Sequence, residues 1–245
     1  MGIDADYRAT SRPGRPGIKK GTKSKPIPGP KTQRRTQQER SAEARTRLLT
    51  AAIALICEIG YSRTTMAEIA SRAGMTRGAI QHHFSSRDTL VLAILDALEQ
   101  RILDAFEQVA PDHDISVEEK LDAVIDALGE VAVSDAYLAV LDIWVATRAD
   151  RALALPVRSA IVRATRHYRA LWERIFRDDL PSEVYEDALR IIVGMLRSMV
   201  ISRIFEVTPR SNDLTIAICK DAARRRVAAA SANDQIPVKP RKKTP

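Results

Sequence analysis

Residues 64–90 read TTMAEIASRAGMTRGAIQHHFSSRDTL, and this stretch contains the signals of a short helix followed by a tight turn. Thr65 and Glu68 have the Thr-x-x-Glu spacing of a capping box, which predicts a helix beginning at Met66. Gly74 predicts the end of this helix, because a residue without a Cβ atom enters the left-handed backbone conformation at little cost.

A second short helix is expected after the turn, because Thr76 can cap a helix that continues to His83. Two short helices joined by a glycine turn form a helix-turn-helix unit. Its inner side needs small or apolar residues, and the sequence supplies Ile69, Ala70, Met75 and Ile80. Its outer side presents a polar surface sized for a DNA major groove, made of Thr76, Arg77, Gly78, Gln81 and His82.

The same stretch resembles the DNA-binding domain of the tetracycline-repressor (TetR) family of bacterial regulators. The resemblance is specific over roughly residues 40–98, and it rests on Thr64–Thr65, Ile69–Ala70, Ala73–Ile80, His82–Phe84 and Ser86–Leu90. Beyond this region it consists of the number and order of helices. It implies an all-α protein of about nine helices, with an N-terminal three-helix helix-turn-helix domain and a C-terminal helical effector and dimerisation domain.

Residue by residue, the resemblance implies a set of DNA contacts that extends beyond the second helix of the unit. Gln81 stands where the family usually has a tyrosine, and this change can alter which operator is read. Arg87 stands where the family usually has a lysine, and it keeps a cation for phosphate. The expected DNA-binding residues are Arg40, Arg45, Thr64, Thr65, Thr76, Arg77, Gly78, Gln81, His82 and Arg87.

The positive charge of the chain is concentrated at its two ends. The formal net charge is +8, and residues 1–40 hold 11 Lys or Arg against 3 acidic residues. Residues 1–36 are rich in Pro and Gly and poor in large apolar residues, which predicts a disordered basic arm. Such an arm holds the DNA backbone electrostatically, serves only solubility, or reflects a misassigned start. Residues 231–245 predict a second basic disordered tail.

Apolar residues spaced by three and four predict helices along the rest of the chain. The helix at 37–59 precedes the helix-turn-helix unit, and the helix at 87–109 joins this unit to the remainder. Further helices are predicted at 116–133, 135–148, 156–177, 182–205 and 213–229. Together with the resemblance, these elements imply a helix-turn-helix domain at 37–86 and a ligand-binding and dimerisation domain at 87–230.

The predicted helix at 182–205 has an unusually wide apolar surface, so it must be covered on two sides. Its own core can cover one side, and a second subunit is expected to cover the other. The expected subunit contact comprises Ile191, Met195, Arg197, Met199, Ile201 and Ile204.

Aromatic residues with polar tips recur beside methionines where helices of the TetR family enclose a ligand cavity. As a group they suit an apolar or aromatic small molecule, although ordinary core packing explains each residue singly as well. The expected pocket comprises Tyr137, Leu141, Trp144, Tyr168, Trp172, Met195 and Met199, with His167 beside them. Asp142 and Arg148 are either polar contacts for such a ligand or surface residues.

The sequence contains no constellation that indicates catalysis, a metal site or a cofactor. His82 and His83 are neighbours, so on a helix they point about 100° apart and do not share one ion easily. Cys57 and Cys219 lie in apolar helical patterns and are expected to be buried and unreactive. The apolar runs are too short for a membrane span and no secretory signal is recognisable, so the chain is expected to stay in the cytoplasm.

Together these patterns predict a homodimeric transcriptional regulator that binds double-stranded DNA and is not an enzyme. It is expected to repress from a palindromic operator and to be released by an apolar or aromatic small molecule. The alternative is a DNA-binding protein of the same fold that a protein partner controls, or that acts structurally, without a small-molecule inducer.

Overall fold

The computed structural model describes residues 36–109, 115–205 and 209–232, and residues 37–245 form one unit distinct from residues 1–36. The predicted arm at 1–36 and the predicted tail at 231–245 lie almost entirely outside the described residues. Within the described ranges all regular structure is helical, as the sequence predicts. The elements are α1 (Gln37–Ile59), the short 3₁₀ helix η1 (Tyr61–Arg63), α2 (Met66–Arg72), α3 (Arg77–His83), α4 (Arg87–Val109), α5 (Val117–Ala132), α6 (Asp135–Ala146), α7 (Arg151–Phe176), α8 (Ser182–Ile204) and α9 (Pro209–Ala232).

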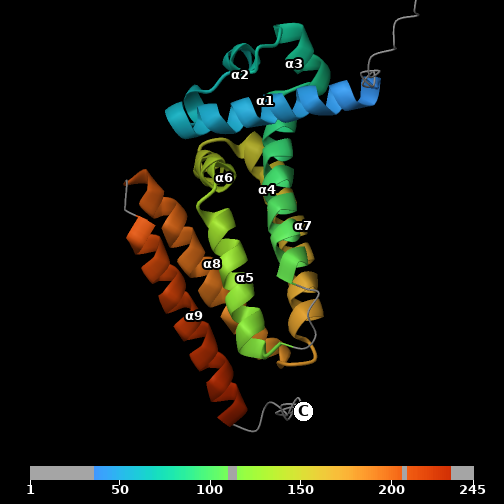
Figure 1. Cartoon of the computed structure of the whole chain (residues 1–245). Helices are drawn as coiled ribbons and strands as arrows, with labels where there is room; N and C mark the ends of the chain where they lie inside the picture. The colour runs from blue at the N-terminus through green and yellow to red at the C-terminus, as the bar shows by residue number, and fades with distance from the viewer. Residues whose placement is uncertain (1–35, 110–114, 206–208, 233–245) are drawn as a thin grey trace, which may run out of the picture. The chain divides into compact units, whose positions relative to one another are not determined.

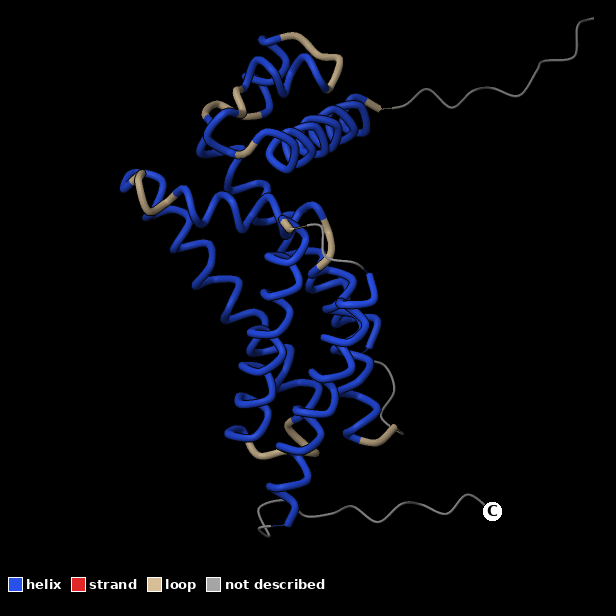
Figure 2. The backbone as a smooth tube through the Cα atoms, turned by 90° about the vertical axis from the view of Figure 1, so that its left-hand side faces the viewer, coloured by secondary structure: helices blue, strands red, loops and turns tan. Residues whose placement is uncertain are grey.

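The N-terminal helices form a layer at one end of a bundle of longer helices (Figure 1). In this layer α1 lies across the end of α4, and α2 and α3 lie on the far side of α1. In the bundle α4 packs against α5 and α7, while α9 packs against α8 and α5. The view turned by 90° shows the same layer beyond the end of the bundle (Figure 2).

The signals predicted for the helix-turn-helix unit are formed in the structure. Thr65 Oγ1 accepts a hydrogen bond from the backbone N–H of Glu68 at 3.3 Å, and Glu68 Oε2 accepts one from the backbone N–H of Thr65 at 2.9 Å. Gly74 has φ +64°, in the left-handed region. Thr76 Oγ1 accepts the backbone N–H of Ala79 at 3.2 Å. The two helices therefore begin, and are separated, where the sequence predicts.

Two helices are longer than the sequence predicts. α7 begins at Arg151 rather than at 156, because Asp150 Oδ1 accepts the backbone N–H of Leu153 at 3.0 Å and caps the helix more than one turn earlier. Pro156 therefore lies inside α7, where it lacks the N–H that would bond to the preceding turn. α9 spans Pro209–Ala232 rather than 213–229.

Two clusters of buried apolar residues hold the helices together. The first runs from α1 through the helix-turn-helix unit into α4, α6 and α7, from Leu48 to Ala160. Ile80 on the inner side of α3 and Phe84 after it are 0% and 2% exposed within this cluster. The second cluster joins α5, α8 and α9 with the far ends of α4 and α7. The first cluster therefore crosses the predicted domain boundary after residue 86.

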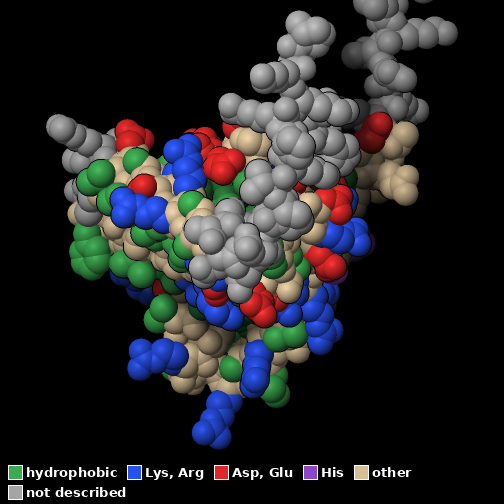
Figure 3. All heavy atoms as spheres, turned by 90° about the horizontal axis from the view of Figure 1, so that it is seen from below, with side chains coloured by type: hydrophobic (Ala, Val, Ile, Leu, Met, Phe, Trp, Pro, Cys, Tyr) green, Lys and Arg blue, Asp and Glu red, His purple; other side chains and the backbone are tan. Residues whose placement is uncertain are grey.

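The end of the molecule away from the helix-turn-helix unit carries charges of both signs. Acidic and basic side chains are interspersed over the part of this end that is visible in Figure 3. Ion pairs also join parts of the bundle. Lys120 Nζ on α5 lies 2.6 Å from Asp179 Oδ2 in the turn after α7, and Lys220 Nζ on α9 lies 2.6 Å from Asp126 Oδ1 on α5. A surface of mixed charge attracts a polyanion weakly.

Candidate functional site

The outer face of α3 is polar and open to solvent. The residues predicted for this face, Thr76, Arg77, Gly78, Gln81 and His82, are all exposed. Ile80 is fully buried on the opposite side, which confirms the predicted inner and outer sides of the helix. Arg77 and Gln81 carry side chains of the kind that form paired hydrogen bonds with base edges in a major groove.

Further exposed groups flank this face. Arg40 and Arg45 are exposed on α1, and the Arg45 guanidinium lies 5.2 Å from the centroid of the Phe84 ring. Thr65 is exposed at the start of α2. Cations and hydroxyl groups are the usual partners of the DNA backbone. These three residues therefore have the exposure that a contact with phosphate requires.

Two residues expected to bind DNA make contacts within the protein. Thr64 is 4% exposed, and its hydroxyl donates to the backbone oxygen of Gly60 at 2.9 Å. Thr64 is therefore wrong as a DNA contact, because its side chain faces the core. The Arg87 guanidinium lies 3.9 Å from the centroid of the Tyr61 ring and donates to the backbone oxygen of Tyr61. Arg87 is partly exposed beside Tyr61, and its contact with phosphate stays a prediction.

Tyr61 connects the helix-turn-helix unit to α6, and the sequence patterns do not reveal this role. Gly60 has φ +84° and turns the chain into η1, where Tyr61 is 7% exposed. The backbone N–H of Tyr61 donates to Asp142 Oδ2 on α6 at 2.5 Å. Asp142 is thus neither the ligand contact nor the free surface residue that the sequence leaves open. It ties α6 to the segment that precedes α2.

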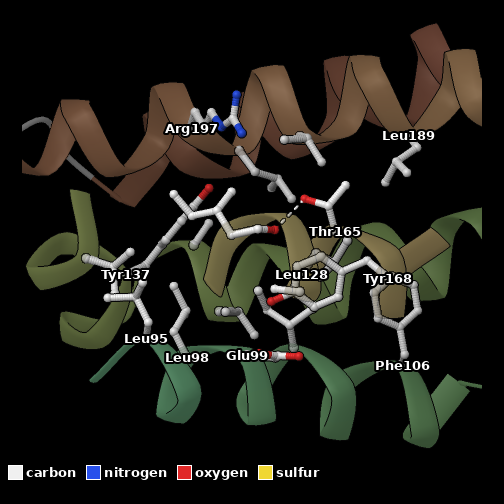
Figure 4. Close-up of a pocket in the computed structure, with 18 of the residues that line it drawn as sticks. Leu95, Leu98, Glu99, Phe106, Leu128, Tyr137, Thr165, Tyr168, Leu189 and Arg197 are labelled. Atoms are coloured by element: carbon white, nitrogen blue, oxygen red, sulfur yellow. Dashed lines mark hydrogen bonds between the residues drawn. The ribbon is translucent and has the colours of Figure 1, made fainter. Parts of the chain in front are cut away.

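The helices α4 to α8 enclose a cavity of about 260 Å³ (Figure 4). Its wall is largely apolar, with a few polar groups among aliphatic and aromatic side chains. In Figure 4, Tyr137 and Arg197 lie toward one end of the cavity, while Phe106 and Leu189 lie toward the other. The enclosed apolar space has the character of a small-molecule site.

Four of the seven residues expected in the pocket line this cavity, namely Tyr137, Trp144, Tyr168 and Trp172. The prediction is wrong for Leu141, Met195 and Met199. Met199 is 1% exposed in the core of α5, α8 and α9, and Leu141 and Met195 pack against that core. The physical reason is helix rotation, since α8 turns Leu189, Val193 and Leu196 toward the cavity instead.

The sequence patterns also do not reveal the wall that α4 contributes. Leu95, Leu98, Glu99, Ile102 and Phe106 line the cavity from this helix. The apolar members follow the spacing of any buried helix face, so they carry no separate signal. Glu99 is the exception, because a carboxylate that is 8% exposed interrupts this face.

Three ionisable groups of the wall, Glu99, Tyr137 and Tyr168, are held in paired or neutral forms. Glu99 Oε1 lies 2.6 Å from His167 Nδ1. Burial raises the pKa of Tyr137, against the opposing effect of the Arg197 cation. Burial also raises the pKa of Tyr168, and the nearby Glu99 raises it further. Both phenols therefore stay protonated at neutral pH.

Two indole groups of the wall are unpaired. The Nε1–H groups of Trp144 and Trp172 are buried, and neither has a hydrogen-bond partner among the described residues. The Arg197 guanidinium lies 5.8 Å from the centroid of the Trp144 ring. Arg197 was expected in the subunit contact from the sequence pattern, and the structure places it at the cavity wall.

The apolar surface expected to contact a second subunit is only partly exposed. Ile201 and Ile204 are 46% and 58% exposed near the end of α8. Ile191 and Met195 are partly buried. Met199 is wrong as a subunit contact, because its own subunit buries it almost completely.

The described residues show no arrangement of three or more His, Cys, Asp or Glu side chains suited to a metal ion. None of the described helices has the length and hydropathy needed to span a bilayer. Cys219 is buried and Cys57 is partly buried, and burial raises the pKa of each thiol to about 11. At neutral pH both thiols are therefore protonated and poorly nucleophilic.

A capped two-helix unit with an exposed polar face, joined to a bundle with an internal cavity, defines a helix-turn-helix DNA-binding protein. Residues 48–94 match the family described as bacterial regulatory proteins, tetR family. The chain is 27% identical over 184 residues to the HTH-type transcriptional regulator CymR of Pseudomonas putida, covering 71% of this chain and 86% of CymR.

Two further comparisons agree. The chain is 34% identical over 121 residues to an uncharacterized HTH-type transcriptional regulator of Mycobacterium bovis, covering 49% of this chain and 60% of that relative. The solved structure of a TetR-family regulator from Mesorhizobium loti superposes with a TM-score of 0.61 at 19% identity, covering 78% of this chain and 98% of that one. The chain belongs to the TetR family of DNA-binding transcriptional regulators, which are not enzymes.

Proposed function

We propose that this TetR-family protein is a homodimeric cytoplasmic repressor that leaves a palindromic operator when an apolar or aromatic small molecule occupies its cavity. The observation that carries the proposal is the shared helix α4. It begins at Arg87, shortly after α3, and it lines the cavity as far as Phe106. One helix therefore touches both the DNA-binding unit and the proposed effector site.

In this proposal α3 reads the operator and exposed groups around it hold the backbone. Arg77 and Gln81 contact base edges, since arginine pairs with guanine and glutamine with adenine. Thr76 and Gly78 lie at the start of the same exposed face. The proposed phosphate contacts are Arg40, Arg45, Thr65 and His82, all of which are exposed.

The proposed subunit contact lies on α8 and α9. Ile201, Ile204 and Phe205 are 46%, 58% and 72% exposed, and Leu214 and Ile218 on α9 are 60% and 48% exposed. The two helices pack against each other, and exposed large apolar residues that gather on one surface are typical of an interaction site. A second copy of the chain that covers this surface forms a two-fold dimer, which presents two α3 helices to two half-sites.

The cavity sets the size of the proposed effector. An apolar cavity of about 150 Å³ holds benzene, so 260 Å³ gives room for roughly ten non-hydrogen atoms. Tyr137, Trp144, Tyr168 and Trp172 supply aromatic surface for such a molecule.

The coupling that release requires is modest. A hundredfold loss of operator affinity corresponds to about 2.7 kcal/mol, which lies within the usual range for allostery. The coupling is reciprocal, so operator DNA weakens effector binding by the same factor. A small displacement of α4 by a bound effector changes the spacing of the two α3 helices, and the dimer then no longer matches the operator.

The proposal is tested by selecting bound fragments from genomic DNA and then measuring the affinity of Arg77→Ala for the selected operator. The variant should lose about 1–3 kcal/mol on the operator and far less on random DNA, because it removes a base contact. Arg225→Ala is the control, since Arg225 is 79% exposed on α9. If Arg77→Ala loses no more affinity for the operator than Arg225→Ala does, α3 does not read the DNA sequence. If no small molecule changes operator affinity, control by a protein partner replaces the proposed induction.

A further inference from the structure

Some hydrogen-bonding groups of the cavity wall have partners within the protein, and others have none among the described residues. The acceptor Glu99 is engaged, with His167 Nδ1 at 2.6 Å from one carboxylate oxygen and Arg163 Nη2 at 3.8 Å from the other. The Nε1–H groups of Trp144 and Trp172 are buried without a partner among the described residues. An indole nitrogen donates and does not accept. Two lining residues therefore carry unpaired donors, while the carboxylate of the wall already has partners.

A cation lies close to one of these two indole rings. The Arg197 Cζ atom is 5.8 Å from the centroid of the Trp144 ring, and the Tyr137 ring centroid is 6.4 Å from it. Within the described part of the chain no carboxylate forms an ion pair with Arg197, whereas Arg169 pairs with Glu186 at 3.4 Å. Figure 4 shows Arg197 and Tyr137 toward the same end of the cavity. Donor groups are therefore concentrated at this end.

The opposite end of the cavity is apolar. Phe106 and Leu189 lie toward it in Figure 4. The ring of Trp172 packs between Phe106 and Phe176, with centroid distances of 5.8 Å and 4.8 Å. Aromatic rings thus enclose Trp172, which leaves Trp144 as the donor beside the cation.

We propose that the effector is a compact, mostly apolar molecule with one hydrogen-bond acceptor oxygen, and that the Trp144 indole N–H receives this oxygen beside Arg197. The apolar body then extends toward Phe106 and Leu189. This inference rests on the proposed effector role of the cavity. A ligand that supplies the missing acceptor relieves an unpaired buried donor, which a hydrocarbon of the same shape does not. A ligand whose polar group only donates meets the Trp144 N–H and the Arg197 cation, and this discriminates against it.

Four benzene derivatives that fit a cavity of this volume test the inference: ethylbenzene, acetophenone, benzoate and benzylammonium. Their affinities for the full chain are measured by isothermal titration calorimetry at pH 7. The ketone and the carboxylate should bind about tenfold more tightly than ethylbenzene, and the ammonium should bind most weakly. Arg197→Met should reduce any preference for the carboxylate over the ketone, because it removes the charge and keeps much of the apolar stem.

Trp144→Phe removes the N–H and keeps an aromatic ring. It should lower the affinities of the ketone and the carboxylate about tenfold, and unchanged ethylbenzene binding shows that the cavity is intact. Trp172→Phe is the matched control and should keep the preference for the two oxygen compounds. Each of four results would overturn the inference: Trp144→Phe keeps the preference, Trp172→Phe loses it, the ammonium binds most tightly, or no compound binds.

Operator release is measured separately, by fluorescence anisotropy of operator DNA with each compound. Binding with the expected preference but without any loss of operator affinity supports the ligand chemistry and removes the proposed effector role. If the compounds release the operator but show no preference for an acceptor oxygen, the effector role of the cavity is supported and the proposed ligand chemistry is overturned.

Discussion

Asp142→Ala removes the carboxylate that joins α6 to η1. In the wild-type chain Asp142 Oδ2 accepts the backbone N–H of Tyr61 at 2.5 Å, and Tyr61 is 7% exposed. The substitution leaves this backbone donor without its partner in a place that water reaches poorly. Hydrogen bonds to charged groups contribute about 1.5–3 kcal/mol. We therefore expect the free energy of unfolding to fall by about 2 kcal/mol.

Unfolding in guanidinium chloride, followed by circular dichroism, measures this loss. Wild type and variants are compared at one protein concentration, because the stability of a dimer depends on concentration. For a chain of this size, about 2 kcal/mol corresponds to a decrease in Tm of roughly 4–8 °C. Asp142→Asn keeps an acceptor oxygen without the charge, so it should lose less than Asp142→Ala.

Asp96→Ala is the matched control, because it also removes a single aspartate from a helix. Asp96 and its partner Arg163 are 56% and 50% exposed, so the loss of this pair should cost less than about 1 kcal/mol. If Asp142→Ala is no less stable than Asp96→Ala, the bond to Tyr61 does not support the fold and the reasoning is refuted.

Three further expectations concern the dimer, the N-terminal segment and the cysteines. Ile204→Glu places a carboxylate in the proposed subunit contact, and Ile204 is 58% exposed within its own subunit, so the variant should fold. Sedimentation should then show folded monomers, and an unchanged dimer would place the contact elsewhere. Deletion of residues 1–36 should weaken binding to all DNA and flatten its salt dependence, and an unchanged slope would show that the segment does not contact phosphate. Burial raises the pKa of Cys57 and of Cys219 to about 11, so their alkylation at pH 8 should be about a hundredfold slower than that of a thiol with the usual pKa of 9.0. Mass spectrometry that showed rapid labelling of the native protein would contradict this.

Local signals explain why the N-terminal helices follow from the sequence. Capping side chains and glycine turns act within about four residues, so Thr65, Gly74 and Thr76 determine helix limits before any tertiary contact is known. Asp150 is a signal of the same kind, yet Pro156 shifts the predicted start of α7 beyond it, because proline is typical of the first helical turn. The predicted start of α7 is therefore wrong because it follows the signal of Pro156 rather than the capping signal of Asp150.

The orientation of side chains in the C-terminal half has no such local signal. Met199 and Ile201 lie two positions apart on α8, yet they are 1% and 46% exposed. A wide apolar surface indicates that a helix is covered on more than one side. It does not indicate which side meets the cavity, the subunit core or a second subunit, because this depends on how neighbouring helices are rotated. Tyr137 and Trp144 could be placed at the cavity through the family resemblance, whereas Met195 and Met199 could not.

The unbroken core from Leu48 to Ala160 restricts how this regulator can acquire a new specificity. An exchange of the region 37–86 with that of a relative would replace one side of the contact between α1 and α6, and the mismatched side chains would have to repack. Arg77 and Gln81 are exposed and lie outside this core, so substitutions there alter the DNA surface at little cost to folding. Engineering of a new operator preference, and its evolution, should therefore proceed by point changes on α3, because the helix-turn-helix region and the bundle share one core.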